Sequence, residues 1–149
     1  MSPHSVFIID DDPAMRDALV LMLRGAGYRA RSFLSADDFL TNLPEDRSAC
    51  VITDVRMPGI GGVELTRRVK QADPSVPVIV ITGHADVPLA IQAMKAGAVD
   101  FLTKPVRDQT FLDAVSAAIT ADIARRAAST VSSKYLALYE ALTPREREV

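Results

Sequence analysis

The stretch from Ser48 to Gly62, SACVITDVRMPGIGG, decides how the rest of the chain is interpreted. Its first part is a run of apolar and β-branched residues that predicts a buried strand, and its glycines predict a tight turn directly afterwards. Asp54 stands at the end of the apolar run, where an unpaired charge is costly to bury. A carboxylate in this position raises the question of what Asp54 does, and the neighbouring segments answer it.

Strand-like and helix-like segments alternate along the whole chain. The strand-like runs are SVFII (5–9), YRARSF (28–33), ACVIT (49–53), VPVIVIT (76–82) and AVDFL (98–102). Helical periodicity occurs at 14–24, 36–43, 63–71, 89–95 and from 108 onward. Five consecutive strand–helix units of this kind predict an α/β fold with a doubly wound parallel sheet.

The character of each run indicates its place in the sheet. The first, third and fourth runs are nearly all apolar, which is typical of central parallel strands covered on both faces, whereas YRARSF alternates and suits an edge. Asp12 followed by Pro13 predicts the start of the first helix. Gly25 or Gly27 is expected to end that helix, and Gly97 is expected to end the fourth.

Composition limits the classes of protein that remain. A chain of 149 residues with 48% hydrophobic and 24% charged residues predicts one globular domain plus an appendage. The net charge of -2 does not mark the whole chain as a nucleic-acid or membrane-surface binder. No apolar run reaches about 18 residues and the start lacks a secretory signal, so we expect a cytoplasmic protein without a membrane partner. The single cysteine, Cys50, is predicted to be a small buried hydrophobe.

Polar side chains follow four of the five predicted strands. In chain order they are Asp10, Asp11 and Asp12, then Asp54, then Thr82 with Gly83, and finally Lys104 with Pro105. Because ligands of doubly wound sheets bind outside the carboxyl ends of the strands, we expect these groups to converge on one edge. Two carboxylates about 4 Å apart repel each other by roughly 4 kcal/mol at an effective dielectric constant near 20. The cluster therefore predicts a bound cation, and its oxygen donors favour Mg²⁺.

Several short motifs make this sequence similar to a known family. They are RMPG at 56–59, GVEL at 62–65, VITGHADVP at 80–88, AMKAGAVDF at 93–101 and KP at 104–105. With them the sequence resembles a response-regulator receiver domain of two-component signalling, of the FixJ type in the LuxR/FixJ family, from about Ser5 to Ala121. The resemblance implies a flavodoxin-like strand order of 2-1-3-4-5, helices on both faces of the sheet and a long C-terminal helix.

The resemblance also implies a function for Asp54, which would accept a phosphoryl group from a sensor histidine kinase. Carboxylates are established nucleophiles for aspartyl-phosphate formation. Mg²⁺ would be held by Asp10, Asp11, Asp54 and the backbone carbonyl of Arg56, with Asp11 a direct ligand and Asp10 acting mainly through water. Asp12 extends the acidic pair, and we interpret it as a helix cap rather than as a ligand.

Three further residues match the family pattern. Lys104 would supply a positive charge and Thr82 a hydrogen bond to the phosphoryl group, while Thr82 and Phe101 would form the switch pair. The resemblance also favours a cis peptide bond between Lys104 and Pro105. The protein is accordingly expected to be a phosphoacceptor switch and not an enzyme, with at most self-phosphorylation from small donors and slow self-dephosphorylation.

Two other classes of protein share features with this sequence and are alternatives to a receiver domain. A haloacid dehalogenase-type phosphatase also uses an aspartate nucleophile, and Asp10 to Asp12 contains its D-x-D pattern, with Thr82 and Lys104 following later. That class needs an acidic pair after the lysine, for which Asp108 and Asp113 are badly spaced, and 149 residues leave no cap domain. A nucleotide or flavin binder would need a glycine-rich phosphate loop, and neither G-x-x-x-x-G-K-[ST] nor G-x-G-x-x-G occurs.

The helix predicted at 14–24 is the expected docking site of the kinase. Its core stripe is predicted from helical spacing to consist of Met15, Ala18, Leu19 and Met22. Ala14, Val20 and Leu21 would then remain as apolar groups near the surface, which favours contact with a partner.

The composition shifts after the receiver-like region, 1–121, into a helical linker at 122–142. From the end of the receiver-like region through the linker, apolar or small residues recur at alternating spacings of four and three, at Ala117, Ala121, Ala124, Ala128, Val131, Tyr135, Leu138 and Leu142. This heptad pattern predicts a two-stranded coiled coil. An amphipathic linker helix that folds back on the sheet is the alternative.

The last residues, 143–149, complete a motif that resembles the start of a LuxR-type helix-turn-helix domain. The motif is LTPREREV, in which Thr143 would cap a helix that begins at Pro144. We expect the sequence to stop at the start of a DNA-binding domain, so that DNA contact depends on residues absent here. Homodimers are expected to form through the fourth helix, fifth strand, fifth helix and linker, and to control transcription.

Overall fold

The structure is a computed structural model that describes residues 4–41 and 50–140, with side chains as far as residue 125 except that of His84. The strands are β1 (Ser5–Ile9), β2 (Arg29–Phe33), β3 (Cys50–Asp54), β4 (Val78–Thr82) and β5 (Asp100–Thr103). The helices are α1 (Pro13–Gly25), α2 (Ala36–Thr41), α3 (Gly62–Ala72), α4 (Val87–Ala96) and α5 (Asp108–Glu140), with a short 3-10 turn, η1 (His84–Asp86), before α4.

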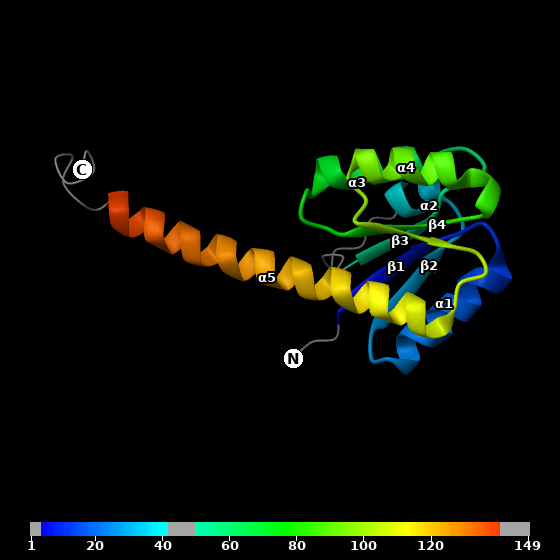
Figure 1. Cartoon of the computed structure of the whole chain (residues 1–149), viewed down its shortest axis with the longest axis horizontal. Helices are drawn as coiled ribbons and strands as arrows, with labels where there is room; N and C mark the ends of the chain where they lie inside the picture. The colour runs from blue at the N-terminus through cyan, green and yellow to red at the C-terminus, as the bar shows by residue number, and fades with distance from the viewer. Residues whose placement is uncertain (1–3, 42–49, 141–149) are drawn as a thin grey trace.

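The five strands form one parallel sheet in the order β2-β1-β3-β4-β5, which confirms the predicted fold. Every residue of β3 and β4 is buried, whereas β2 lies at the edge, as predicted, and buries only Ala30 and Phe33. Helices α1 and α5 cover one face of the sheet, and α2, α3 and α4 cover the other (Figure 1). The carboxyl ends of the central strands are therefore the places where loops can present polar side chains.

Aromatic packing supports the α2 side of the sheet. The rings of Phe7, Phe33 and Phe39 are all buried, with ring centroids between 5.1 and 6.1 Å apart. Burying a phenylalanine side chain stabilises a fold by about 1.5–3 kcal/mol. This cluster fixes β1 against β2 and α2, next to the end of β1 where the first acidic residues lie.

The caps of α1 and α4 follow the predicted chemistry. Asp12 Oδ1 accepts a hydrogen bond from the backbone N–H of Ala14 at 3.0 Å, and Pro13 occupies the first turn. Helix α1 ends at Gly25, and Gly27 has a φ of 95° in the turn to β2. Gly97 ends α4 with a φ of 119°, a left-handed conformation that glycine adopts without strain.

The predicted core stripe of α1 was partly wrong. Leu19 is buried as expected, but Ala18 is exposed and Leu23 is buried in its place. Val20 packs against the core, while Leu21 keeps 74% of its surface exposed. The buried stripe follows the i, i+4 spacing of Leu19 and Leu23, because α1 turns this side toward α5 and the sheet.

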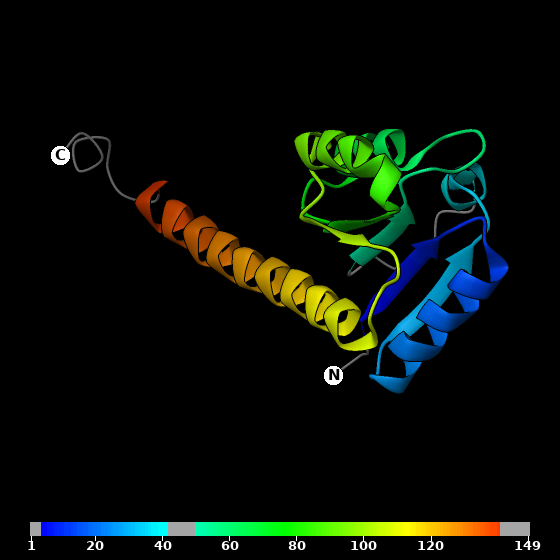
Figure 2. The ribbon, with the colours of Figure 1, turned by 45° about the vertical axis from the view of Figure 1, so that its right-hand side comes forward.

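Helix α5 continues well beyond the sheet (Figures 1 and 2). Among the residues of α5 whose side chains are described, those that face the core are Phe111, Val115, Ala118, Ile119 and Asp122. The first three residues of the predicted seam, Ala117, Ala121 and Ala124, are exposed on another side of the helix. The side chains of the later seam positions and the segment 143–149 lie outside the described residues, so the coiled coil stays a prediction.

Candidate functional site

Three carboxylates meet at the carboxyl ends of β1 and β3. Asp10 follows β1 and is 1% exposed, Asp54 is the last residue of β3 and is 7% exposed, and Asp11 is exposed. One oxygen from each carboxylate lies within 4.8 Å of the others. The structure thus brings together the acidic residues that the sequence predicts at this edge, in an arrangement that can bind a metal ion.

Asp10 has an unsatisfied oxygen. Its Oδ1 accepts a hydrogen bond from the backbone N–H of Asp12 at 2.9 Å, while its buried Oδ2 has no hydrogen-bond partner among the described residues. Burial raises the pKa of Asp10, and the charge of Asp54 raises it further, against the opposing hydrogen bond from Asp12. Because an unpaired buried carboxylate oxygen is costly, this atom fits a cation.

Lys104 binds the carboxylate of Asp54 directly. Its Nζ donates to Asp54 Oδ2 at 2.8 Å, and the backbone N–H of Arg56 donates to Oδ1 at 3.2 Å. Burial lowers the pKa of Lys104, but the hydrogen bond and charge of Asp54 outweigh this effect, so the pKa is raised overall. The ammonium group therefore stays charged beside Asp54. The predicted cis bond between Lys104 and Pro105 is confirmed.

Thr82 and Phe101 lie on neighbouring strands beside this cluster. The Thr82 side chain is buried at the end of β4, and its hydroxyl donates to the carbonyl oxygen of Gly83 at 3.0 Å. Phe101 is only partly buried because it lies on the edge strand β5. It packs against the core formed with α2, α3 and α4.

The loop after β3 approaches the site so closely that it needs a residue without a side chain. A Cβ atom on Gly62 would lie 2.5 Å from the carbonyl oxygen of Asp54 and 2.8 Å from the Cα of Val55. Gly59 in the same loop has a φ of 76°, which favours glycine. The glycines of the opening motif therefore set the position of the Asp54 backbone.

An ion pair that the sequence analysis missed bridges the two loops beside the site. The guanidinium of Arg56 contacts Asp86 Oδ1 at 2.7 Å through Nη2, and its hydrogen bonds lower the pKa of Asp86. From the sequence, only the backbone carbonyl of Arg56 is expected to have a role. Residues 30 positions apart in two loops share no local spacing, so no sequence pattern signals this contact.

Comparison with known proteins identifies the family. The sequence model of the response regulator receiver domain matches residues 6–116. The chain belongs to the response regulator receiver family. It is 43% identical over 144 residues to the transcriptional regulatory protein FixJ of Bradyrhizobium diazoefficiens, which covers 97% of this chain and 70% of that protein. It is 42% identical to nodulation protein W of the same species, again over 97% of this chain, and spans only 63% of that protein's length.

Solved structures agree with this membership. The crystal structure of full-length FixJ from B. japonicum superimposes with a TM-score of 0.79 at 41% identity, covering 99% of this chain and 72% of that one. The structure described as FixJ-N gives a TM-score of 0.74 at 42% identity, covering 80% of this chain and 96% of that one. This chain therefore contains a receiver domain of the FixJ type, and the comparisons do not favour the phosphatase alternative.

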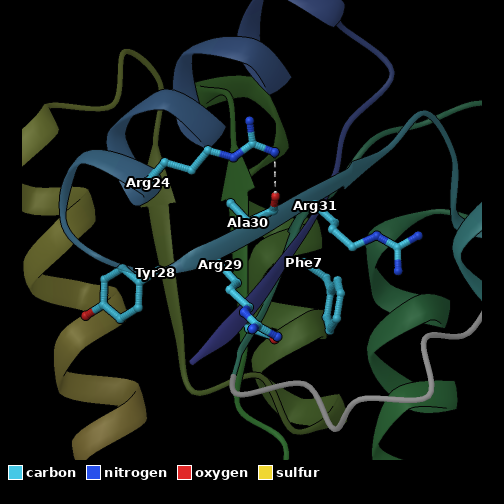
Figure 3. Close-up of a pocket in the computed structure, with 7 residues that line it drawn as sticks. Phe7, Arg24, Tyr28, Arg29, Ala30 and Arg31 are labelled. Carbon is cyan, nitrogen blue, oxygen red and sulfur yellow. Dashed lines mark hydrogen bonds between the residues drawn. The ribbon is translucent and has the colours of Figure 1, made fainter. Parts of the chain in front are cut away.

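A separate hollow of about 410 Å³ lies toward the amino ends of β1 and β2, away from the carboxylates (Figure 3). The Nη2 of Arg24 donates to the carbonyl oxygen of Ala30 at 3.0 Å, and the guanidinium of Arg31 lies 5.5 Å from the Phe33 ring centroid. Arg24 thus occupies a backbone acceptor of the edge strand β2, and charged side chains on an edge strand discourage pairing with a strand of another chain. The receiver site lies at the opposite end of these strands.

Proposed function

We propose that this receiver is a phosphorylation-dependent switch in which Asp54 accepts a phosphoryl group from a sensor histidine kinase. The observation that carries the proposal is the buried Asp54 carboxylate, which is held by Lys104 at 2.8 Å beside Asp10 and Asp11. A nucleophile, a fixed cation and two further acidic groups meet at one sheet edge, as phosphoryl transfer requires.

The chemistry assigns a step to each side chain. An oxygen of Asp54 forms a bond to phosphorus while the P–N bond of the phosphohistidine breaks. The leaving nitrogen keeps the bonding electron pair, and the imidazole takes up a proton from solvent. Lys104, already in contact with Asp54 Oδ2, stabilises the negative charge on the phosphoryl oxygens. The hydroxyl of Thr82 turns from the carbonyl of Gly83 to a phosphoryl oxygen.

Mg²⁺ is the ion that fits the acidic groups. Asp10, Asp11, Asp54 and the backbone carbonyl of Arg56 would hold it, since hard oxygen donors suit this ion. The buried, unpartnered Oδ2 of Asp10 supports the assignment. When bound, Mg²⁺ supplies positive charge that offsets the repulsion between the carboxylates and an incoming phosphoryl group.

Phosphorylation is proposed to act on the surface formed by α4, β5 and α5. It adds about 1.5 to 2 negative charges, which draw Thr82 inward and leave space for the partly buried Phe101. Ile91, Met94 and Val99 expose apolar surface on α4 and next to β5, which favours homodimerisation there. Coupling between two sites of this kind is typically about 1 to 3 kcal/mol, so we expect dimers to tighten by roughly 5- to 150-fold.

The linker part of α5 would carry this change to a DNA-binding domain outside the present sequence, in a cytoplasmic transcription regulator. Transcriptional regulation in FixJ supports this part of the proposal. None of the described helices has the length and apolar character that crossing a bilayer requires.

The decisive experiment is incubation with acetyl phosphate and Mg²⁺ followed by intact mass spectrometry. We expect one added phosphoryl group, lost on chelation of the metal and in Asp54→Asn. Stoichiometric labelling that survives Asp54→Asn would exclude Asp54 as the acceptor.

A further inference from the structure

The ion pair between Arg56 and Asp86 joins the loop after β3 to the loop after β4. Both Nε and Nη2 of Arg56 donate to the same oxygen, Asp86 Oδ1, at 3.0 and 2.7 Å. The Arg56 side chain is 70% exposed, while that of Asp86 is 19% exposed. The carboxylate is thus fixed in the protein surface, and the long arginine side chain reaches across to it.

Each partner is connected to a group of the proposed phosphorylation site. The backbone N–H of Arg56 donates to Asp54 Oδ1 at 3.2 Å, two residues from the nucleophile. The backbone N–H of Asp86 donates to the carbonyl oxygen of Gly83 at 3.0 Å, and Gly83 directly follows Thr82. Lys104, which holds Asp54, also acts electrostatically on Asp86 and helps to lower its pKa. The ion pair therefore links the loop of the nucleophile to the loop that must move with Thr82.

We propose that this ion pair is a clasp that holds the two loops in the resting arrangement, and that Arg56 leaves Asp86 for the phosphoryl group once Asp54 is phosphorylated. The inference rests on the proposed function of Asp54. No covalent bond to Arg56 is involved, because the exchange replaces one set of charge-assisted hydrogen bonds by another.

Charge favours the exchange. A phosphoryl group carries about 1.5 to 2 negative charges and three acceptor oxygens, whereas Asp86 offers one charge. Guanidinium groups bind phosphate with two parallel hydrogen bonds, while Arg56 here uses two donors on a single carboxylate oxygen. Once Arg56 has left, Asp86 no longer ties the loop after β4 to the loop after β3.

If the ion pair is such a clasp, substitutions of Asp86 and of Arg56 should shift the balance between the resting and the phosphorylated form in opposite directions. Asp86 competes with the phosphoryl group for Arg56, so removing its charge should favour the phosphorylated form. Arg56 binds the phosphoryl group, so removing its charge should disfavour that form. A contact that only stabilises the fold would give the same direction for both substitutions.

The test is titration of the whole chain with beryllofluoride, a phosphoryl mimic, at saturating Mg²⁺. Wild type is compared with Asp86→Asn, Arg56→Gln and the double variant. Since an exposed ion pair contributes only a small free energy, Asp86→Asn should bind beryllofluoride about 1.5- to 5-fold more tightly than wild type. Arg56→Gln should bind several-fold more weakly, and the double variant should match Arg56→Gln. Near 1 M salt, where screening acts within about 3 Å, the advantage of Asp86→Asn should shrink.

Glu64→Gln is the matched control, because it removes one negative charge from another exposed ion pair, with Arg67 at 3.1 Å on α3. It should leave beryllofluoride binding unchanged. The clasp is refuted if Asp86→Asn binds no better than wild type, if Glu64→Gln gives the same gain, or if both clasp variants shift binding in one direction. Failure of wild type to bind beryllofluoride would instead refute the proposed function itself.

Discussion

The two ends of β3 each place a nucleophilic side chain near a buried carboxylate, yet only one end forms a site. At the amino end, Cys50 is fully buried, and the charge of Asp122 on α5 acts on it and on Lys70. At the carboxyl end, Asp54 lies with Asp10 and Asp11.

The two ends of β3 differ more in the balance of their charges than in the burial of their side chains. Asp122 is 4% exposed but has cations nearby, with Arg125 Nη2 at 3.8 Å and Lys70 within electrostatic range. In the described part of the chain, the carboxyl end gathers three carboxylates, and the ammonium of Lys104 contacts that of Asp54. The excess of negative charge at the carboxyl end is partly open to solvent and favours binding of a cation. The balanced charge of buried Asp122 instead stabilises the packing of α5.

The largest expected effect is on the reactivity of Cys50, which should be unreactive although Asp54 at the other end of β3 is the proposed phosphoacceptor. Burial, followed by the charge of Asp122, raises the pKa of the Cys50 thiol to about 12. Because the thiolate is the reactive form, iodoacetamide should modify Cys50 only when the fold opens, at least about 10³-fold more slowly than a free cysteine. Mass spectrometry under native conditions and in urea measures this. Rapid native alkylation would contradict the buried environment.

Substitution of Gly62 should disturb the carboxyl end of β3 at its backbone. The Cβ of Gly62→Ala would lie 2.5 Å from the Asp54 carbonyl oxygen, so the loop must shift, and we expect a loss of about 1–3 kcal/mol in the free energy of unfolding. Labelling by acetyl phosphate should fall as well. Gly25→Ala is the control, because its Cβ would have no heavy atom within 4 Å and should cost little. Equal urea denaturation curves for the two variants would count against the close contact.

Asp122→Asn should destabilise the amino end of β3, where the charge of Asp122 is balanced, without affecting the carboxylate site at the other end. Loss of the buried charge beside Lys70 and Arg125 is expected to lower the free energy of unfolding by about 1–3 kcal/mol. Binding of Mg²⁺ should stay unchanged. Asp113→Asn, an exposed change on the same helix, should stay within about 0.5 kcal/mol of wild type. Denaturation with urea distinguishes the two, and similar values for both would mean that Asp122 is not an anchor.

Asp10→Asn should change the free energy of unfolding least, by less than about 1 kcal/mol, and should raise it where the other substitutions lower it. Because the folded-state pKa of Asp10 is raised above 3.8, the folded protein retains a proton that the unfolded chain releases, so stability falls as pH rises from about 3.8 through the folded-state value. The asparagine variant lacks this loss and should be more stable than metal-free wild type at neutral pH. Added Mg²⁺ should reverse the order, because it stabilises only wild type. Urea titrations across this pH range, with and without Mg²⁺, provide the measurement.

Much of this architecture could be predicted because it depends on local periodicity. Apolar runs identify β1, β3 and β4, and the rule that loops at the carboxyl ends of parallel strands converge brings Asp10, Asp11 and Asp54 together before any coordinates are known. The caps at Asp12 and Gly97 follow equally from short-range chemistry.

Contacts between distant segments required the tertiary structure. The pairing of Arg56 with Asp86 depends on the paths of two loops, and the burial of Asp122 depends on how α5 packs against β3. Helical spacing predicted a core stripe on α1 that wrongly included Ala18 and omitted Leu23, because neighbouring elements decide which side of a helix is covered. Sequence alone therefore determined which groups lie at the sheet edge, since strand ends are set by the chain itself. Only packing decided which cation meets which carboxylate, since that depends on distances between segments far apart in the chain.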